Sequence, residues 1–193
     1  MRPCRSHPCV WLALALAVIC GSVLAAPPRV RIETSAGNIV VQLEPERAPL
    51  SVKNFLQYAT DGFYTGTIFH RVVTGFIIQG GGYQEDLTLK PARPSIANES
   101  GNGLSNHRGT IAMARSADPH SADAQFYFNL ADNVTLDPKP TRWGYAVFGE
   151  VTEGMEVVDD IGHRATGVRN DLADVPVKPV VIRKVVVLPD PEP

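Results

Sequence analysis

Short runs of β-branched and aromatic residues, each closed by a turn-forming residue, constrain the fold of this chain more than any other feature. Val, Ile, Thr, Phe and Tyr favour strands, whereas Gly, Pro, Asn and Asp end them. Many short strands bounded in this way are typical of all-β barrels and sandwiches. The predicted strands cover residues 30–34, 38–44, 67–73, 76–81, 110–115, 125–130, 145–151 and 180–188.

Two segments have the apolar spacing of an α-helix instead. Residues 50–62 carry apolar side chains at positions i, i+3, i+4 and i+7, with Pro49 at the entry and Gly62 at the exit. Residues 152–162 carry a shorter stripe. Each predicted helix has one apolar face, so each is expected to lie on the sheet or to close an open end. The apolar residues are Val52, Phe55, Leu56 and Ala59 in the first helix and Met155, Val158 and Ile161 in the second.

The segment 84–108 is rich in Pro, Gly and Asn and predicts a long loop. A loop of this length in a compact domain is more often functional than idle. The acidic, proline-rich end of the chain, residues 189–193, is expected to be disordered.

The N-terminal segment has the layout of a secretory signal peptide. A basic start at Arg2 and Arg5 precedes an apolar run over residues 10–24, and small residues follow at Ala25 and Ala26. The apolar run is too short for a membrane-spanning helix. We expect cleavage after Ala25, with Ala26 as the alternative, and a single domain over residues 26–193.

Removal of residues 1–25 takes away all three cysteines, Cys4, Cys9 and Cys20. The rest of the chain then has no disulfide, thiolate metal site or cysteine nucleophile. It keeps the 20 acidic residues and loses two of the 18 basic ones, so its net charge is −4. An acidic domain without basic runs argues against nucleic acid and anionic membranes as partners, and no stable membrane insertion is expected after cleavage. We expect a monomer.

Metal and covalent chemistry have no matching motif. His70, His107, His120 and His163 are scattered without metal-ligand spacing. There is also no G-x-S-x-G motif for a serine nucleophile. The sequence therefore predicts no metal and no cofactor.

The stretch 67–82, TIFHRVVTGFIIQGGG, predicts a β-hairpin with an arginine inside an apolar run. By alternation Arg71 shares a strand face with Phe69 and Val73. We expect it to pair with Gln79, whereas a one-residue slip of the register would turn Arg71 away from Gln79. A solvent-facing arginine is the simpler alternative, because antiparallel sheets often keep one face wet. A cation, an amide and nearby aromatic residues instead favour a shallow apolar cleft with one polar contact point. These aromatic residues are Phe76, Phe126, Tyr127 and Tyr145.

Four segments together carry a resemblance to a known family. FHRVVTGFIIQGG, GTIAMAR, QFYFN and GYAVFGEV occur in this order between residues 69 and 151. The chain from about Val30 to Leu188 resembles the cyclophilin family of peptidyl-prolyl cis-trans isomerases, and it is especially similar to exported bacterial members of the periplasm. The resemblance implies a closed eight-stranded antiparallel β-barrel capped by two α-helices. It also implies isomerisation of Xaa-Pro peptide bonds during the folding of exported proteins, with proline-containing peptides and unfolded exported proteins as partners.

The resemblance also implies a set of site residues. Arg71 matches the catalytic arginine. The walls of the proline pocket match Phe76, Ile77, Tyr127 and Leu136, and the groove for the peptide backbone matches Gln79, Ala114, Arg115 and Gln125. His70, Phe126 and Tyr145 are further expected contacts with the substrate.

Three residues depart from the family pattern. Tyr127 replaces the usual phenylalanine, so the pocket floor carries a hydroxyl that needs a partner. Thr135 replaces a tryptophan or phenylalanine, which should weaken the binding of cyclosporin-type ligands. Arg115 replaces a small polar residue. Tyr127 and Thr135 leave open a proline-peptide binding module or chaperone that uses the same groove with weak turnover. A barrel with only a structural role ranks behind the isomerase and this alternative.

Overall fold

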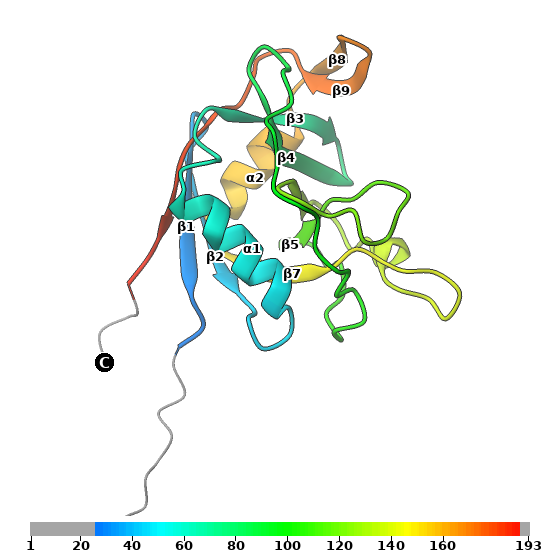
Figure 1. The fold of residues 1–193 in the computed structure, drawn as a ribbon. Helices are drawn as coiled ribbons and strands as arrows, with labels where there is room; N and C mark the ends of the chain where they lie inside the picture. The colour runs from blue at the N-terminus through cyan, green and yellow to red at the C-terminus, as the bar shows by residue number, and fades with distance from the viewer. Residues whose placement is uncertain (1–25, 190–193) are drawn as a thin grey trace, which may run out of the picture.

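The computed structural model describes residues 26–189. The predicted signal peptide and residues 190–193 of the predicted tail lie outside the described residues. An antiparallel sheet of eight strands dominates the fold (Figure 1). In their order across the sheet, the strands are β10 (Ile182–Val187), β1 (Arg29–Thr34), β2 (Asn38–Leu43), β7 (Val147–Glu153), β5 (Thr110–Met113), β6 (Phe126–Asn129), β4 (Ile77–Gln84) and β3 (Thr67–Val73).

The two edge strands of this sheet, β3 and β10, meet and nearly close it into a barrel. The amide of Phe69 donates to the carbonyl of Val180 at 3.0 Å, and the amide of Gly66 donates to that of Ile182 at 2.9 Å. Ile68 also forms an antiparallel bridge with Val181. The predicted eight-stranded antiparallel barrel is therefore confirmed, and closure leaves few backbone groups on an open edge.

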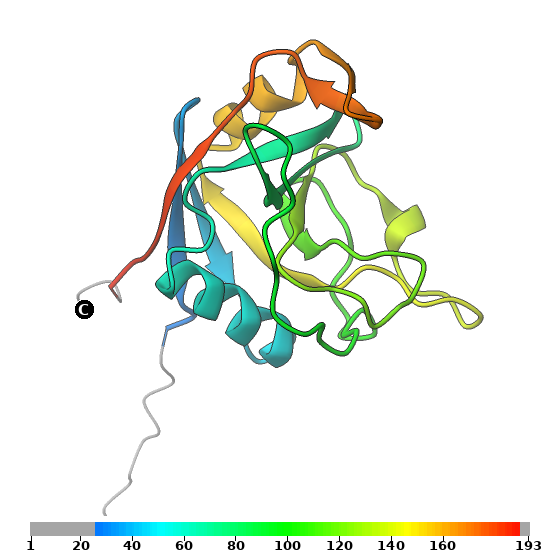
Figure 2. The ribbon, with the colours of Figure 1, turned by 45° about the horizontal axis from the view of Figure 1, so that its top comes forward.

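Both predicted helices are present and pack their apolar faces into one core. Helix α1 (Pro49–Thr60) and helix α2 (Met155–Gly162) lie on different sides of the barrel (Figure 2). Phe55 of α1 and Ile161 of α2 are both fully buried in the same cluster as the inward side chains of the strands. Each helix therefore covers one part of the barrel interior. No helix in residues 26–189 is long and apolar enough to cross a membrane.

The long loop between β4 and β5 is fixed by hydrogen bonds. The Glu99 carboxylate accepts hydrogen bonds from the amides of Leu50 and Ser51 at 2.9 and 2.8 Å, so it caps the N-terminus of α1 from a distant segment. The loop therefore has a defined position beside the sheet. A 3₁₀ turn, η1 (Val134–Leu136), follows β6.

The structure contains a hairpin that was not predicted from the sequence. Strands β8 (Thr166–Arg169) and β9 (Leu172–Pro176) pair with each other in a separate two-stranded sheet. The turn residues Asn170 and Asp171 both have positive φ, 47° and 63°, as in a tight hairpin turn. The segment was overlooked because β8 is exposed along its length and carries no apolar run. Strand β9 packs against β3, on the outside of the barrel (Figure 1).

Candidate active site

A β-bulge in β3 decides which way Arg71 faces. Phe69 lies opposite Gly80 and Arg71 lies opposite Gln79, so two steps along β3 match one step along β4. Phe69 consequently points into the barrel core, whereas Arg71 lies on the outer face and is partly exposed. The predicted pairing of Arg71 with Gln79 is confirmed. The prediction that Arg71 shares a face with Phe69 is wrong, because simple alternation along the strand ignores the bulge.

The register of the sheet aligns Arg71 with a row of residues across four strands. Gln79 of β4 lies opposite Tyr127 of β6, and Tyr127 lies opposite Ala112 of β5. The row runs from a cation, through an amide, to a buried aromatic ring and a small side chain. Neighbouring strands are about 4.8 Å apart, so the row is long enough to hold a short peptide segment.

An apolar cluster on the outer face forms the floor and walls beside this row. Tyr127 is 2 % exposed, and its ring lies 5.9 Å from that of Tyr145 at 76°. Leu136 reaches the cluster from the 3₁₀ turn, and its carbonyl accepts a hydrogen bond from the Tyr145 amide at 2.9 Å. All four predicted wall residues belong to this cluster: Phe76, Ile77, Tyr127 and Leu136. Ala114 and Tyr145 are also members.

A polar hollow of about 270 Å³ adjoins the apolar cluster. Gln79 donates from Nε2 to Oε1 of Gln125 at 3.1 Å, so the two amides hold each other in place. The predicted groove residues Gln79, Ala114, Arg115 and Gln125 all line this hollow. They are therefore brought together as expected for a peptide-binding groove.

Arg115 holds one rim of the groove. Its guanidinium donates to the carbonyls of Gly144, Ser116 and Trp143 at distances of 2.9 to 3.1 Å. Its Cζ atom lies 4.4 Å from the centre of the Tyr145 ring, in cation–π geometry. The larger side chain at this position thus fixes the rim and the ring of Tyr145.

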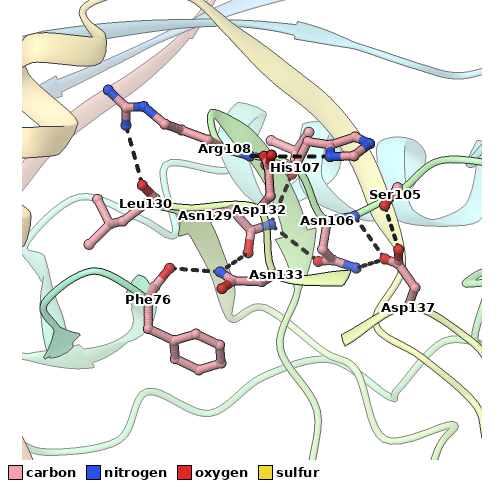
Figure 3. A network of polar contacts seen from close by, with 11 residues as sticks. Phe76, Ser105, Asn106, His107, Arg108, Asn129, Leu130, Asp132, Asn133 and Asp137 are labelled. Atoms are coloured by element: carbon pink, nitrogen blue, oxygen red, sulfur yellow. Dashed lines mark hydrogen bonds and ion pairs between the residues drawn. The ribbon is translucent and has the colours of Figure 1, made fainter. Parts of the chain in front are cut away.

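The hydroxyl of Tyr127 has a buried partner. It donates to Oδ1 of Asn106 at 2.7 Å, and Asn106 is completely buried. Burial raises the pKa of Tyr127 well above its ordinary value, so the hydroxyl stays protonated. Asn106 donates in turn to Asp137 at 2.8 Å (Figure 3). Sequence reasoning missed Asn106, because nothing within the loop 84–108 indicates which of its amides lies under the floor.

The same network ties the floor to the hairpin of Arg71 (Figure 3). Asn129 donates to Asn106 at 3.2 Å, and Asn133 donates to the carbonyl of Phe76 at 2.8 Å and to Asn129 at 2.8 Å. Burial acts to raise the pKa of Asp137, but hydrogen bonds from Ser105 and Asn106 outweigh it and hold that pKa below its ordinary value. The carboxylate is therefore an acceptor at neutral pH.

Two predicted contact residues are buried, and one of them, Phe126, does not face the groove. Phe126 alternates with Tyr127 along β6, and its fully buried side chain packs in the barrel core at 5.4 Å from the ring of Tyr64. His70 is 5 % exposed, and its ring packs 4.5 Å from that of Tyr83. The prediction of a substrate contact is corrected for Phe126, because adjacent residues in a regular strand face opposite sides. His70 lies within the bulge, where this alternation does not hold, and its contact with the substrate stays a prediction.

Burial also sets the charge of His70. It lowers the pKa of the imidazole to about 4; the neighbouring Arg71 acts in the same direction, whereas a hydrogen bond with the backbone of Ile68 opposes it. At pH 7 the ring is neutral. Arg71 is thus the cation that β3 presents to the groove.

Arg71 has an acidic neighbour that the sequence did not indicate. Its Nε atom lies 3.6 Å from Oδ2 of Asp174, which belongs to the unpredicted strand β9. Within residues 26–189, no group of three or more His, Cys, Asp or Glu side chains could hold a metal ion. The groove thus offers the guanidinium of Arg71, the side-chain amides of Gln79 and Gln125 and an apolar floor, with Arg115 bound to the rim.

Fold and groove together define a class of protein: a small antiparallel β-barrel with a shallow, partly apolar groove for an extended chain on its outer face. The family model described as "Cyclophilin type peptidyl-prolyl cis-trans isomerase/CLD" matches residues 29–187. The chain therefore belongs to the cyclophilin-type peptidyl-prolyl cis-trans isomerase family, and its activity is the isomerisation of Xaa-Pro peptide bonds.

Similar proteins agree with this assignment. The chain is 51 % identical to peptidyl-prolyl cis-trans isomerase A of Dickeya dadantii over 154 residues, which cover 80 % of this chain and 81 % of that protein. It is 48 % identical to peptidyl-prolyl cis-trans isomerase B of Escherichia coli over 161 residues, which cover 82 % and 98 %. A crystal structure of a cyclophilin-type isomerase from Cryptosporidium parvum, obtained in the presence of the dipeptide Ala-Pro, is similar with a TM-score of 0.72 and 27 % identity, covering 84 % and 99 %.

Proposed function

We propose that Arg71 is the catalytic residue of this isomerase and that its substrates are proline-containing segments of exported proteins. The observation that carries the proposal is the row of Arg71, Gln79 and Tyr127 across adjacent strands. It places a guanidinium next to an apolar floor that suits a proline ring. The flanking amides suit the peptide backbone on either side.

The chemistry of the peptide bond explains why these residue types fit. Resonance between the nitrogen lone pair and the carbonyl resists rotation with a barrier of about 18 to 20 kcal/mol. In the twisted transition state the nitrogen becomes pyramidal and accepts a hydrogen bond. A fixed guanidinium directed at that nitrogen binds the transition state more strongly than either planar ground state, which is the requirement for catalysis.

The energy of one such contact shows what the rest of the groove must supply. A hydrogen bond to a charged group contributes about 1.5 to 3 kcal/mol net. A millionfold acceleration needs about 8 kcal/mol. The remainder comes from the apolar cluster that holds the ring, from the amides of Gln79 and Gln125 that orient the backbone, and from exclusion of water near the nitrogen.

The layout of residues 1–25 supports export of this isomerase to the periplasm. The crystal structure of the Cryptosporidium parvum relative in the presence of Ala-Pro supports proline-containing peptides as ligands. Unfolded exported proteins expose such segments before they fold, and slow Xaa-Pro isomerisation delays their folding. Secretion of the full-length chain from a bacterial host, with N-terminal sequencing of the periplasmic product, tests the export; retention of residues 1–25 in a cytoplasmic product would contradict it.

Variants of Arg71 test the catalytic role. Arg71→Ala removes the donor and should lower kcat/KM on a Xaa-Pro peptide at least about tenfold. Arg71→Lys keeps the charge but loses the planar set of donors, so it should recover only part of the rate. Two-dimensional NMR exchange between the cis and trans peptide measures both.

Arg183→Ala is the matched control, because Arg183 is an exposed arginine on β10. It should match the wild type. Equal rates for Arg71→Ala and wild type would overturn the catalytic role. Peptide binding with no isomerisation by the wild type would favour the binding-module alternative, which Thr135 in place of an aromatic residue supports.

A further inference from the structure

We infer that Asp174, on the hairpin of β8 and β9, is a positioning residue that orients the guanidinium of Arg71. The inference rests on the proposed role of Arg71. It adds to the site a residue from a segment that lies about 100 positions further along the chain. Within residues 26–189, Asp174 is the acidic residue within ion-pair distance of Arg71.

The hairpin is anchored where Asp174 can act. Val175, the next residue along β9, is fully buried and packs in an outer cluster with Ile68 of β3 and Leu87. Ile68 stands three positions before Arg71 on the same strand. The apolar contact therefore fixes β9 against β3, and the carboxylate of Asp174 has a defined place beside the guanidinium.

The backbone at Asp174 supports a role for its side chain. Its φ is +59°, in the left-handed region that glycine adopts without cost. Most other residues are disfavoured there, although aspartate and asparagine tolerate it better. Asp174 lies within β9, where the pairing with β8 shifts register; glycine would fit this backbone conformation, yet the sequence has a carboxylate. Backbone conformations of this kind often occur at functional sites.

The geometry of the pair suits orientation more than charge neutralisation. Oδ2 of Asp174 lies 3.6 Å from Nε of Arg71, the nitrogen nearest the aliphatic part of the side chain. At this distance the contact is an ion pair and not a hydrogen bond. A carboxylate on the Nε side favours one orientation of the guanidinium plane, and the terminal N–H groups are the donors that this orientation would offer to a substrate. Gln79, the cross-strand neighbour, is engaged with Gln125 instead. Asp174 is thus the residue that restrains the rotamer-rich side chain before the substrate arrives.

The variant Asp174→Asn removes the negative charge of Asp174 and keeps the shape of its side chain. Asparagine has nearly the same shape and also tolerates positive φ, so the hairpin should keep its fold. The side chains of Arg71 and Asp174 are 41 % and 43 % exposed, so the pair is partly screened by solvent. We expect kcat to fall about two- to fivefold with KM unchanged, the range that an exposed ion pair supports. Asp174→Glu keeps the carboxylate and should recover most of the rate.

Asp171→Asn is the matched control. Asp171 lies in the same hairpin, is exposed and also has positive φ, 63°, and it is not an ion-pair partner of Arg71 in the described residues. It should keep the wild-type rate. Raising the NaCl concentration from 50 mM to 1 M should lower the kcat of wild type and of this control towards that of Asp174→Asn, because salt screens exposed charges. The kcat of Asp174→Asn should change little.

The ¹H–¹⁵N signal of the Arg71 Nε–H group tests the contact without any assay of activity. It should shift and broaden in Asp174→Asn, and remain near the wild-type position in Asp174→Glu and Asp171→Asn. Asp174→Asn with an unchanged signal and an unchanged or higher kcat would overturn the inference. If Arg71→Ala is fully active while the signal still depends on Asp174, the proposed catalytic role fails and the ion pair stands as a structural contact.

Discussion

Aromatic residues pack in the barrel interior and also form the floor of the groove on its outer face, but their contacts differ between the two regions. In the interior, Phe126 packs edge-on against Phe55 and Tyr64, with ring centres 5.4 to 5.5 Å apart. In the groove, the neighbouring residue Tyr127 has a hydroxyl that bonds to Asn106, and its ring contacts Tyr145. The two residues are adjacent in the chain and lie on opposite faces of β6.

This difference separates stability from function. Interior side chains contribute by filling space, so their loss should destabilise the fold and leave the site chemistry in the folded molecules unchanged. Groove side chains are tied to polar partners that fix their orientation, so their loss should alter catalysis or cost one hydrogen bond. Each of the following variants tests whether a residue contributes to the stability of the fold or to catalysis in the groove.

The largest effect is expected from Phe126→Ala. Removing a fully buried phenylalanine from the core should lower the free energy of unfolding by about 3 to 5 kcal/mol, because the packed rings leave a cavity. Urea unfolding followed by circular dichroism measures the loss. The kcat/KM per folded molecule should stay within about twofold of wild type. A larger drop in kcat/KM with little loss of stability would show that Phe126 acts in the groove after all.

A smaller effect on stability is expected from the protonation of His70 at low pH. His70 lies on β3 between the inward Phe69 and the outward Arg71. Its pKa is about 4 in the folded protein, against about 6.5 when unfolded. As the pH falls through this window, the unfolded chain binds a proton that the folded protein does not bind. Stability is therefore lost as the pH falls from about 6.5 to 4, by about 2 to 3 kcal/mol at pH 4.5.

His70→Gln should lack this part of the acid sensitivity. Urea unfolding of both proteins at pH 7 and pH 4.5 gives the difference, and the contributions of other acidic groups cancel between them. The activity of the wild type should be flat between pH 6 and 8, because His70 stays neutral there. A parallel pH dependence of stability in the two proteins would contradict a buried neutral imidazole.

Tyr127→Phe should have the smallest effect. It removes the hydrogen bond to Asn106, whose Oδ1 still accepts from Asn129, so the free energy of unfolding should fall by about 1 kcal/mol. The hydroxyl is occupied below the groove, so kcat/KM should change less than about twofold. A tenfold loss of kcat/KM would mean that the hydroxyl contacts the substrate and does not only bond to Asn106 below the groove.

Much of the fold was predictable because it follows from local patterns. The strands of the barrel and both helices are encoded by runs and stripes of apolar residues such as Val52, Phe55 and Ile161, and burial confirms them. The hairpin that carries Arg71 and Gln79 was also predictable, but the pairing of these two residues depends on a turn of three residues, 74–76, and a two-residue turn at Thr74 and Gly75 would have placed Arg71 opposite Ile78.

Other features could not be read from local patterns. Alternation placed Phe69 beside Arg71, and only the bulge in β3 separates them. Phe126 counted as a groove residue because it neighbours Tyr127, although adjacent strand residues face opposite sides. The hairpin of β8 and β9 had a turn signal at Asn170 and Asp171, but that signal does not reveal what the hairpin packs against.

The sequence by itself determined the strands of the barrel, the two helices and the family motifs, because these depend on residue type and on spacing over a few positions. Only the tertiary structure decided which face each strand residue occupies and which distant groups meet the site residues. Asn106 reaches Tyr127, and Asp174 reaches Arg71, across long stretches of chain. Such contacts depend on barrel closure and on the docking of a loop and a hairpin, since these bring together groups whose separation in sequence carries no local signal.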